Sequence, residues 1–319
     1  MIQTLGRLSE QWLDSDFPLR QSAVRALQVS TGLTPHQVET AIDACFSELT
    51  EEKIRTFVEV EQLEPVEEIK VLHVLPSNVF TAWIHGAVIT LLMKADCWLK
   101  PSTHEPVFAP LWKRSVDQLD PLLGQRIRIV SWTPKILSEV ETVVAYGSDE
   151  TLNRLRQELP PTVRMVGYGH RFSVAAIFKE ALQTTERASL LDRLLADVEP
   201  FRLQGCLSPQ VLYVEGEIPE EFGPLSRRVD RMPRLHRFET WSEVEADLWS
   251  QRGHLSALGY AGPWERVQAL RPNLDALGFS RVCPLGEMQR PPLAWRNGRL
   301  SLVEALHREP ILAKSDGNA

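Results

Sequence analysis

The sequence predicts an α/β protein built on a parallel sheet, and two observations carry this prediction. Short apolar runs alternate with segments of helical length and composition from about residue 68 onward. Such alternation is typical of parallel strands joined by crossover helices. The chain has 319 residues, of which 43% are hydrophobic and 24% charged, a balance that suits one large globular domain or two medium ones.

The elements of the first half follow from local patterns. The segment up to about Glu67 predicts amphipathic helices, and Thr34 before Pro35 is typical of a capped helix start. The strands expected next are Glu68–Leu75, Cys97–Lys100, Arg126–Ser131, Thr142–Tyr146 and Val163–Gly167. The helices expected between them are Val79–Ala95, Pro106–Leu119 and Asp149–Leu159.

The second half predicts a smaller α/β unit. Its expected elements are a helix at 186–198, a loop at Leu203–Pro209, a strand at Val211–Glu215, a charged helical region to about Arg252 and a last helix at Leu302–His307. We expect two domains, residues 1–185 and residues 186–313, followed by a disordered tail at 314–319.

Charge and hydropathy argue against nucleic-acid binding and against a membrane span. The net charge is -7, and basic residues form no run. The N-terminal residues lack the apolar core of a secretory signal. The longest apolar stretch, Val79–Met93, is shorter than the roughly 20 residues that span a membrane, and it contains His85. We therefore expect a buried helix there.

Cysteine usage indicates a reducing compartment. The four cysteines are far apart and form neither a CxxC pair nor a zinc-binding pattern; they are Cys45, Cys97, Cys206 and Cys283. We expect a cytoplasmic protein with no metal site.

Cys206 is the candidate nucleophile. Glycine precedes it and proline follows it within QGCLSP, so it lies in a constrained loop. A thiolate is a strong nucleophile near neutral pH, and free backbone N–H groups in a loop can lower the pKa of a thiol. The alternative is a small buried apolar side chain, which is the usual fate of a free cysteine. Cys45 and Cys97 fall in helix and strand patterns and are expected in the core.

Three strand-to-helix turns are candidate ligand sites, because a parallel sheet binds ligands at the carboxyl ends of its strands. They are Pro76–Asn78, Pro101–Thr103 and Gly147–Asp149. The Asn78 amide could stabilise a developing negative charge on a substrate oxygen, although helix capping explains it equally well. A solvent-exposed turn likewise explains the lysine at the end of the second strand.

Taken in order, five segments resemble the aldehyde dehydrogenase superfamily, and in particular its acyl-CoA reductase branch, which includes the bacterial luciferase-system fatty acid reductase. These segments are LPSNVF, LKPSTHEPVF, VVAYGSDETLNRLRQELP, VGYGHRFSVAAI leading to QGCLSP, and SRVCPLGEMQRPPLAWRNG. The resemblance covers roughly Val71 to Pro292. It implies an aldehyde dehydrogenase-like fold, with a Rossmann-type cofactor domain at 1–185 and a catalytic cysteine domain at 186–313.

The resemblance also implies roles for individual residues. Cys206 would be the acyl-carrying nucleophile, and Asn78 would hold the oxyanion. The residues implied to bind a nicotinamide dinucleotide are Pro76, Ser77, Lys100, Ser102, Gly147, Ser148 and Gly169. Ser77 replaces a tryptophan that contacts the cofactor in many members. Thr103 stands where NAD-preferring members place a glutamate, which favours NADPH over NADH, although Glu105 lies two positions on.

A departure from the family pattern favours reduction over hydrolysis. Hydrolytic members carry a general-base glutamate before a Gly-Gly pair, and Gly167–Arg171 contains none. The resemblance therefore implies an oxidoreductase that converts an acyl thioester to an aldehyde. The acyl donor would be acyl-CoA or another activated acyl group, with an acyl-transferring or synthetase protein as a possible partner. The short region after Cys206 leaves dimerisation open. The alternatives are an aldehyde oxidiser that uses His170 or Glu215 as its base, and a non-catalytic partner protein of the same fold.

Overall fold

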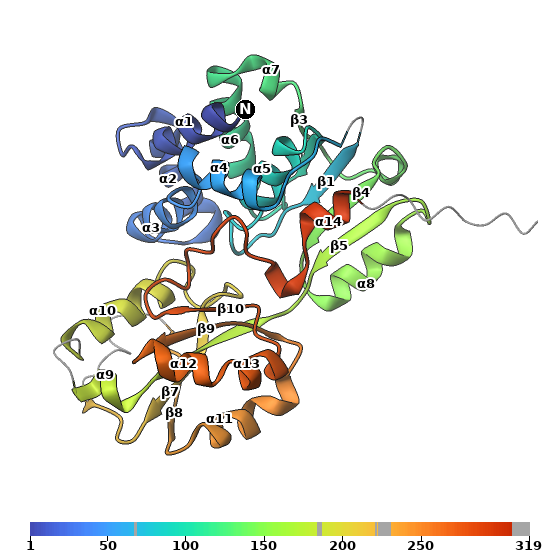
Figure 1. Cartoon of the computed structure of the whole chain (residues 1–319). Coiled ribbons are helices and arrows are strands. Elements are labelled where there is room, and N and C mark those ends of the chain that lie inside the picture. The colour runs from blue at the N-terminus through green and yellow to red at the C-terminus, as the bar shows by residue number, and fades with distance from the viewer. Residues whose placement is uncertain (67–68, 184–186, 221, 223–230, 308–319) are drawn as a thin grey trace, which may run out of the picture.

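The computed structural model describes residues 1–66, 69–183, 187–220, 222 and 231–307 (Figure 1). These residues form two five-stranded sheets in which all paired strands are parallel. The predicted α/β class with a parallel sheet is confirmed. The expected tail at 314–319 lies outside the described residues.

The first sheet has the strand order β3-β2-β1-β4-β5. Its strands are β1 (Lys70–Val74), β2 (Asp96–Lys100), β3 (Ile127–Ile129), β4 (Thr142–Tyr146) and β5 (Arg164–Tyr168). All five correspond to predicted strands. The order reverses between β1 and β4, which is the switch point where doubly wound folds bind ligands.

Helices cover both faces of the first sheet. The larger core lies between the sheet, α5 (Ile84–Leu92), α6 (Phe108–Leu119) and four N-terminal helices. These four are α1 (Ile2–Leu13), α2 (Pro18–Thr31), α3 (Pro35–Phe46) and α4 (Glu51–Val60). On the other face lie α8 (Asp149–Glu158) and the short helix η1 (Pro134–Ser138), while α7 (Pro121–Gly124) precedes β3. The expected cap at Thr34 is present, because its hydroxyl accepts the Gln37 N–H at 3.2 Å.

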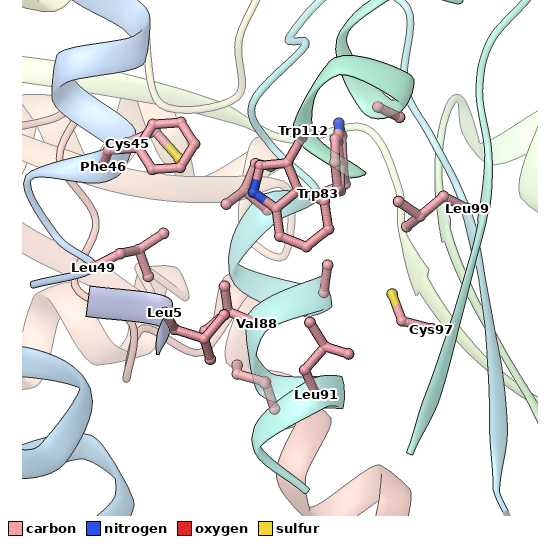
Figure 2. Packing of buried hydrophobic residues seen from close by; sticks show 14 of the residues in the cluster. Leu5, Cys45, Phe46, Leu49, Trp83, Val88, Leu91, Cys97, Leu99 and Trp112 are labelled. Atoms are coloured by element: carbon pink, nitrogen blue, oxygen red, sulfur yellow. The ribbon is translucent and has the colours of Figure 1, made fainter. Parts of the chain in front are cut away.

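The helix predicted from Val79 begins only at Ile84, so the predicted start is wrong. The intervening residues form turns, and these turns place Phe80 and Trp83 in the core. Phe80 packs edge-on against Phe108 with ring centroids 5.0 Å apart, and Trp83 packs edge-on against Trp112 at 5.3 Å. Figure 2 shows Trp83 and Trp112 side by side above the apolar side chains of α5. Residues 79–83 are therefore hydrophobic because side chains among them are buried, although the segment is not helical.

The second sheet has the strand order β10-β9-β6-β7-β8, so its first strand is also its central one. Its strands are β6 (Phe172–Ile177), β7 (Pro209–Glu215), β8 (Arg234–Phe238), β9 (Leu255–Ala261) and β10 (Arg281–Pro284). One face packs on α11 (Trp241–Leu248), α12 (Trp264–Ala269) and α13 (Arg271–Leu277), and the other on α9 (Lys179–Gln183) and α10 (Arg187–Val198). The other helices in the described part of the chain are η3 (Trp249–Gln251), η4 (Asn297–Arg299) and α14 (Leu302–His307).

One detail of the second half differs from expectation. The charged region before Arg252 contains the strand β8, which the sequence analysis assigned to helix. This strand lies at the edge of the sheet, and most of its side chains are exposed. It therefore carries charged residues and lacks the apolar run by which a buried strand is predicted. The chain passes from one sheet to the other between Tyr168 and Phe172, and the domain boundary at 185 stays a prediction.

A turn that follows a strand of the first sheet contacts a loop that precedes a strand of the second sheet. The turn after β1 contacts the loop before β7, through a hydrogen bond from Asn78 to the Gln204 carbonyl. The chain then returns to the first half after β10, and α14 packs into the core of the first sheet through Leu302, Val303 and Leu306 (Figure 1). None of the helices in the described ranges is long and apolar enough to cross a membrane.

Candidate active site

Cys206 lies in the predicted loop, between α10 and β7. The loop is tightly turned: Arg202 and Leu203 both have positive φ angles, of 50° and 61°, and the Ser208 N–H donates to the Gly205 carbonyl at 3.1 Å. The Cys206 side chain is half-buried, whereas Cys45, Cys97 and Cys283 are buried. Among the four cysteines, Cys206 is thus the most accessible.

Ser173, at the start of β6, fixes the Cys206 loop to the second sheet. Its hydroxyl donates to the Cys206 carbonyl at 2.6 Å and accepts the Ala257 N–H at 3.0 Å. Ser256, at the start of β9, contributes a second buried hydroxyl, which lies beside the Cys206 sulfur and lowers the pKa of that thiol. Two serines therefore support the cysteine, but only Ser173 holds its backbone.

We expect Ser173→Ala to lower the free energy of unfolding by about 1–3 kcal/mol, because it leaves a buried N–H and a buried carbonyl unpaired. Ser256→Ala is the matched control, since it removes a buried hydroxyl that bonds to no backbone group of the loop. The measurement is urea unfolding of both variants. Equal stability of the two would show that the Ser173 bridge does not hold the loop.

The environment of the Cys206 thiol differs from expectation. Burial raises its pKa, and this effect outweighs the lowering by the Ser256 hydroxyl, the Cys206 backbone N–H and the Arg171 guanidinium. A backbone N–H of the loop thus lowers the thiol pKa, as the loop position suggested, but burial reverses the net direction. The resting sulfur is a protonated thiol, and its proton must leave when a bond to carbon forms.

A raised thiol pKa predicts the pH dependence of chemical modification. The thiolate is the reactive form, so iodoacetamide should modify Cys206 slowly at neutral pH, with a rate that rises about tenfold per pH unit up to a pKa above the ordinary value. The measurement is the alkylation rate of Cys206 between pH 6 and 10, followed by peptide mass spectrometry. A rate that is already at its plateau at pH 7 would contradict this account of the site.

Asn78 does not cap a helix, which corrects one of the two interpretations of this residue. The helix starts at Ile84, with Trp83 as its N-cap residue. The Asn78 side-chain amide instead donates to the Gln204 carbonyl at 2.9 Å, across 126 residues of sequence. An amide nitrogen carries two hydrogens, so one N–H remains for a substrate.

A second donor lies in the same loop. Within the described chain, the backbone N–H of Cys206 donates to no backbone carbonyl. The amides of Asn78 and Cys206 therefore bring two N–H groups to the loop that carries the sulfur, and donors of this kind can stabilise an oxyanion.

Cys206 opens into a pocket of about 140 Å³ between the two halves of the molecule. Its walls are mostly apolar and come from α4, α5, the ends of β4 and β5, the Cys206 loop and residues 289–303. Tyr146 and Tyr168, at the ends of adjacent strands, stack in its wall with ring centroids 4.9 Å apart. The sequence analysis missed both tyrosines, although each directly precedes a glycine implied to bind cofactor.

The histidines in and behind the pocket are neutral. Burial lowers the pKa of His73 to about 3 and that of His85 to about 4. Gly86 keeps this region open, because a Cβ there would lie 3.1 Å from the Tyr146 hydroxyl and 3.2 Å from the His73 ring. The pocket therefore suits an uncharged, apolar group.

The seven residues implied to bind a dinucleotide lie along one edge of the first sheet. Pro76 and Ser77 follow β1, Lys100 and Ser102 end β2, Gly147 and Ser148 follow β4, and Gly169 follows β5. These four strands are neighbours in the sheet, so the structure brings the residues to one edge. Ser148 caps α8 by accepting the Thr151 N–H at 3.2 Å.

Two charged side chains at this edge differ in whether a ligand can reach them. Lys100 is half-buried and forms no ion pair among the described residues, so its charge is available to a ligand. The carboxylate of Glu105 is not available, because it is buried and accepts the N–H groups of Val107 and Phe108, both at 2.9 Å. Packing also explains why residue 169 is a glycine, because a Cβ there would collide with the carboxylate of Asp149.

Neither alternative base lines the pocket. Glu215 ends β7, whereas Cys206 precedes the start of that strand at Pro209, so about 20 Å of strand separates them. Its carboxylate pairs with Arg266 at 2.6 Å. His170 is exposed, and its backbone N–H donates to Asp149 at 3.0 Å. The structure therefore places no predicted base beside the thiol.

Part of the chain is similar in sequence to curated reductases. The chain is 24% identical over 175 residues to the long-chain acyl-protein thioester reductase of Aliivibrio fischeri, a match that covers 51% of the chain and 36% of that protein. A reductase of the same name from Photorhabdus luminescens is 24% identical over 163 residues, covering 48% of the chain and 33% of that protein. The matched region thus spans about a third of the length of these curated relatives.

The fold has solved counterparts. A benzaldehyde dehydrogenase from Corynebacterium glutamicum superposes with a TM-score of 0.65 at 11% identity, covering 96% of this chain and 81% of that one. The fold is therefore that of the aldehyde dehydrogenases, as the resemblance implied. The family model described as acyl-CoA reductase (LuxC) matches residues 67–226, half of the 319 residues. The chain belongs to the LuxC acyl-CoA reductase family.

Proposed function

We propose that the protein reduces an activated acyl thioester to an aldehyde through a thioester on Cys206, with NADPH as the electron donor. The observation that carries the proposal is the contact between Asn78 and the Cys206 loop, which joins an amide donor from one sheet to a thiol supported by the other. The names of the relatives, an acyl-protein thioester reductase and the acyl-CoA reductase family, support a donor that is a thioester of a protein or of CoA.

The first half-reaction needs no separate base. Cys206 Sγ bonds to the acyl carbon, the bond from that carbon to the donor sulfur breaks, and the Cys206 proton passes to the departing sulfur. The reaction exchanges one thioester for another, so no net charge is created. The N–H groups of Asn78 and Cys206 stabilise the oxyanion that forms on the way.

The second half-reaction uses the same two donors. Lys100, Ser102, Gly147 and Ser148 would hold a nicotinamide coenzyme, which supplies a hydride to the thioester carbonyl when bound. The two amides again stabilise charge on the carbonyl oxygen. The carbon–sulfur bond then breaks, the aldehyde leaves, and Cys206 Sγ takes a proton from water.

The lining of the pocket supports reduction over hydrolysis. Its one carboxylate among the described residues is that of Glu61, which pairs with Arg296 at 3.7 Å. Without a carboxylate base to activate water, the thioester on Cys206 should persist until it is reduced. The preference for NADPH is supported by Thr103 and by the buried capping role of Glu105, because neither places a carboxylate near a ribose phosphate.

The test is a steady-state assay in both directions. We expect NADPH consumption and aldehyde formation with an acyl-CoA, and no acid from aldehyde and NADP⁺ when CoA is absent. Acid production from aldehyde without CoA would instead identify an aldehyde oxidiser. If no acyl adduct forms and neither reaction occurs, the protein is a non-catalytic partner of this fold.

A further inference from the structure

A buried amide side chain that the proposed reaction does not use reaches the Cys206 loop. Gln289, in the segment after β10, lines the Cys206 pocket and is 8% exposed. Its amide nitrogen donates to the Ser208 hydroxyl at 3.1 Å and to the Asp197 backbone carbonyl at 2.7 Å. An amide nitrogen carries two hydrogens, so these two contacts use both. Gln289 therefore joins the Cys206 loop to the end of α10.

Asp197 and Arg281 hold the turn at 286–290 that carries Gln289. The carboxyl oxygens of Asp197 accept the Gly286 N–H at 2.6 Å and the Met288 N–H at 2.8 Å. The Arg281 guanidinium donates to the Met288 carbonyl, also at 2.6 Å. The backbone of this turn is thus fixed through both its N–H groups and its carbonyl groups, which gives the Gln289 side chain a defined origin.

The Gln289 contact lies at the end of the tight turn that carries the sulfur. The Ser208 N–H donates to the Gly205 carbonyl, so Cys206 lies inside a four-residue turn that ends at Ser208. The Ser173 hydroxyl holds the Cys206 carbonyl, and the Gln289 amide holds the last residue of the turn. Both contacts therefore restrict the direction in which the sulfur points.

The same segment covers the sulfur. The Met288 side chain is fully buried and belongs to a small apolar cluster with Leu207, against which Cys206 packs. Burial is also what raises the pKa of the Cys206 thiol. If the two turns separated, water would reach the thiol and its pKa would fall.

The polar network is costly to bury, which favours a role in geometry over a role in stability. Asp197 and Ser208 are fully buried. Burial raises the pKa of the Asp197 carboxyl to about 7, although the N–H donors of the turn and the Arg281 guanidinium lower it. Buried charged groups often contribute little net stability compared with apolar side chains of similar size. A network in which the members are paired instead fixes one arrangement of the groups that it joins.

We infer that Gln289 is a positioning residue for Cys206, which holds the thiol in the direction and the degree of burial that acyl transfer requires. This inference rests on the proposed function, in which Cys206 carries the acyl group. Because Gln289 has no N–H left for a substrate, it acts through Ser208.

Gln289→Met should change two measurements in opposite directions, because methionine keeps the length of the side chain and removes the donor. Cys206 should be alkylated by iodoacetamide severalfold faster at pH 7, with a rate plateau at lower pH. Each unit by which the thiol pKa falls gives about ten times more thiolate, of somewhat lower nucleophilicity. With an acyl-CoA, kcat should fall by about 10–100-fold and KM should stay close to that of the parent, since the nucleophile is misplaced while no substrate contact is lost.

Tyr213→Phe is the control for a general loss of stability. It removes a hydroxyl of the second sheet that donates to Asp247 at 2.5 Å and lies outside the pocket lining. This variant should keep the alkylation profile and the kcat of the parent. A merely structural contribution of Gln289 would not accelerate alkylation while slowing turnover.

Ser208→Ala breaks the same contact from the other side and tests it even if Gln289→Met fails to fold. If the two residues act through one hydrogen bond, the double variant should be alkylated no faster than the more affected single variant. Effects that multiply in the double variant, an alkylation profile unchanged by Gln289→Met, or faster alkylation with the parent kcat would overturn the inference. Alkylation needs no turnover, so a parent protein that reduces no acyl-CoA would refute the proposed function while the alkylation rates still test the contact.

Discussion

Cys206→Ser is expected to abolish aldehyde formation while leaving coenzyme binding intact. Serine keeps the size of the side chain, but its hydroxyl is far less ionised and nucleophilic than a thiol in a site without a carboxylate base. Removing the nucleophile of a covalent mechanism costs up to about 10⁶ in kcat. The measurement is NADPH consumption with an acyl-CoA, together with titration of NADPH fluorescence.

Cys283→Ala is the control for Cys206→Ser. Cys283 is buried in the same apolar cluster that Cys206 packs against, but it lies on β10 and outside the pocket lining. Its loss should leave turnover close to that of the parent. Turnover by Cys206→Ser at the parent rate would remove Cys206 from the mechanism.

Asn78→Ala should lower kcat by about 10²–10³, because one of the two donors to the oxyanion is lost. Its hydrogen bond to the Gln204 carbonyl lies at an exposed position, so the loss of stability should be below about 1 kcal/mol. The measurement is kcat and KM with a saturating coenzyme, alongside thermal unfolding. A stabiliser of the transition state lowers kcat, whereas a contact made equally in the ground state would raise KM.

Asn273→Ala, at an exposed position on α13, controls for the removal of an amide. Asn78→Asp is the sharper variant, since it keeps the size and replaces the donor with a negative charge that repels an oxyanion. We expect it to be at least as impaired as Asn78→Ala. If Asn78→Asp turns over like the parent, the amide has no part in stabilising the oxyanion.

The strands β1, β2 and β4 could be predicted from the sequence because their central residues are buried on both faces. Runs such as KVLHV and TVVAY are continuous apolar segments bounded by turns, and each corresponds to an observed strand. The strands β6 and β8 were not predicted. Only three residues separate β5 from β6, so the sequence contains no helix between them that would indicate the start of a second sheet. The strand β8 is an exposed edge strand rich in charged residues.

The site could be predicted only in part. The glycine and proline around Cys206 indicate its loop, and the resemblance points to Asn78. The contact between Asn78 and the Cys206 loop could not be predicted from local sequence patterns. It joins residues that are far apart in sequence and meet only when the two sheets pack together. The raised pKa of the thiol and the tyrosine pair in the pocket wall also depend on this packing.

Mass spectrometry of the protein mixed with an acyl-CoA in the absence of coenzyme tests the central claim most directly. The account predicts one acyl adduct, mapped by peptide analysis to Cys206 and discharged as aldehyde when NADPH is added. An adduct on Cys45, Cys97 or Cys283, or no adduct under conditions in which aldehyde is formed, would contradict it.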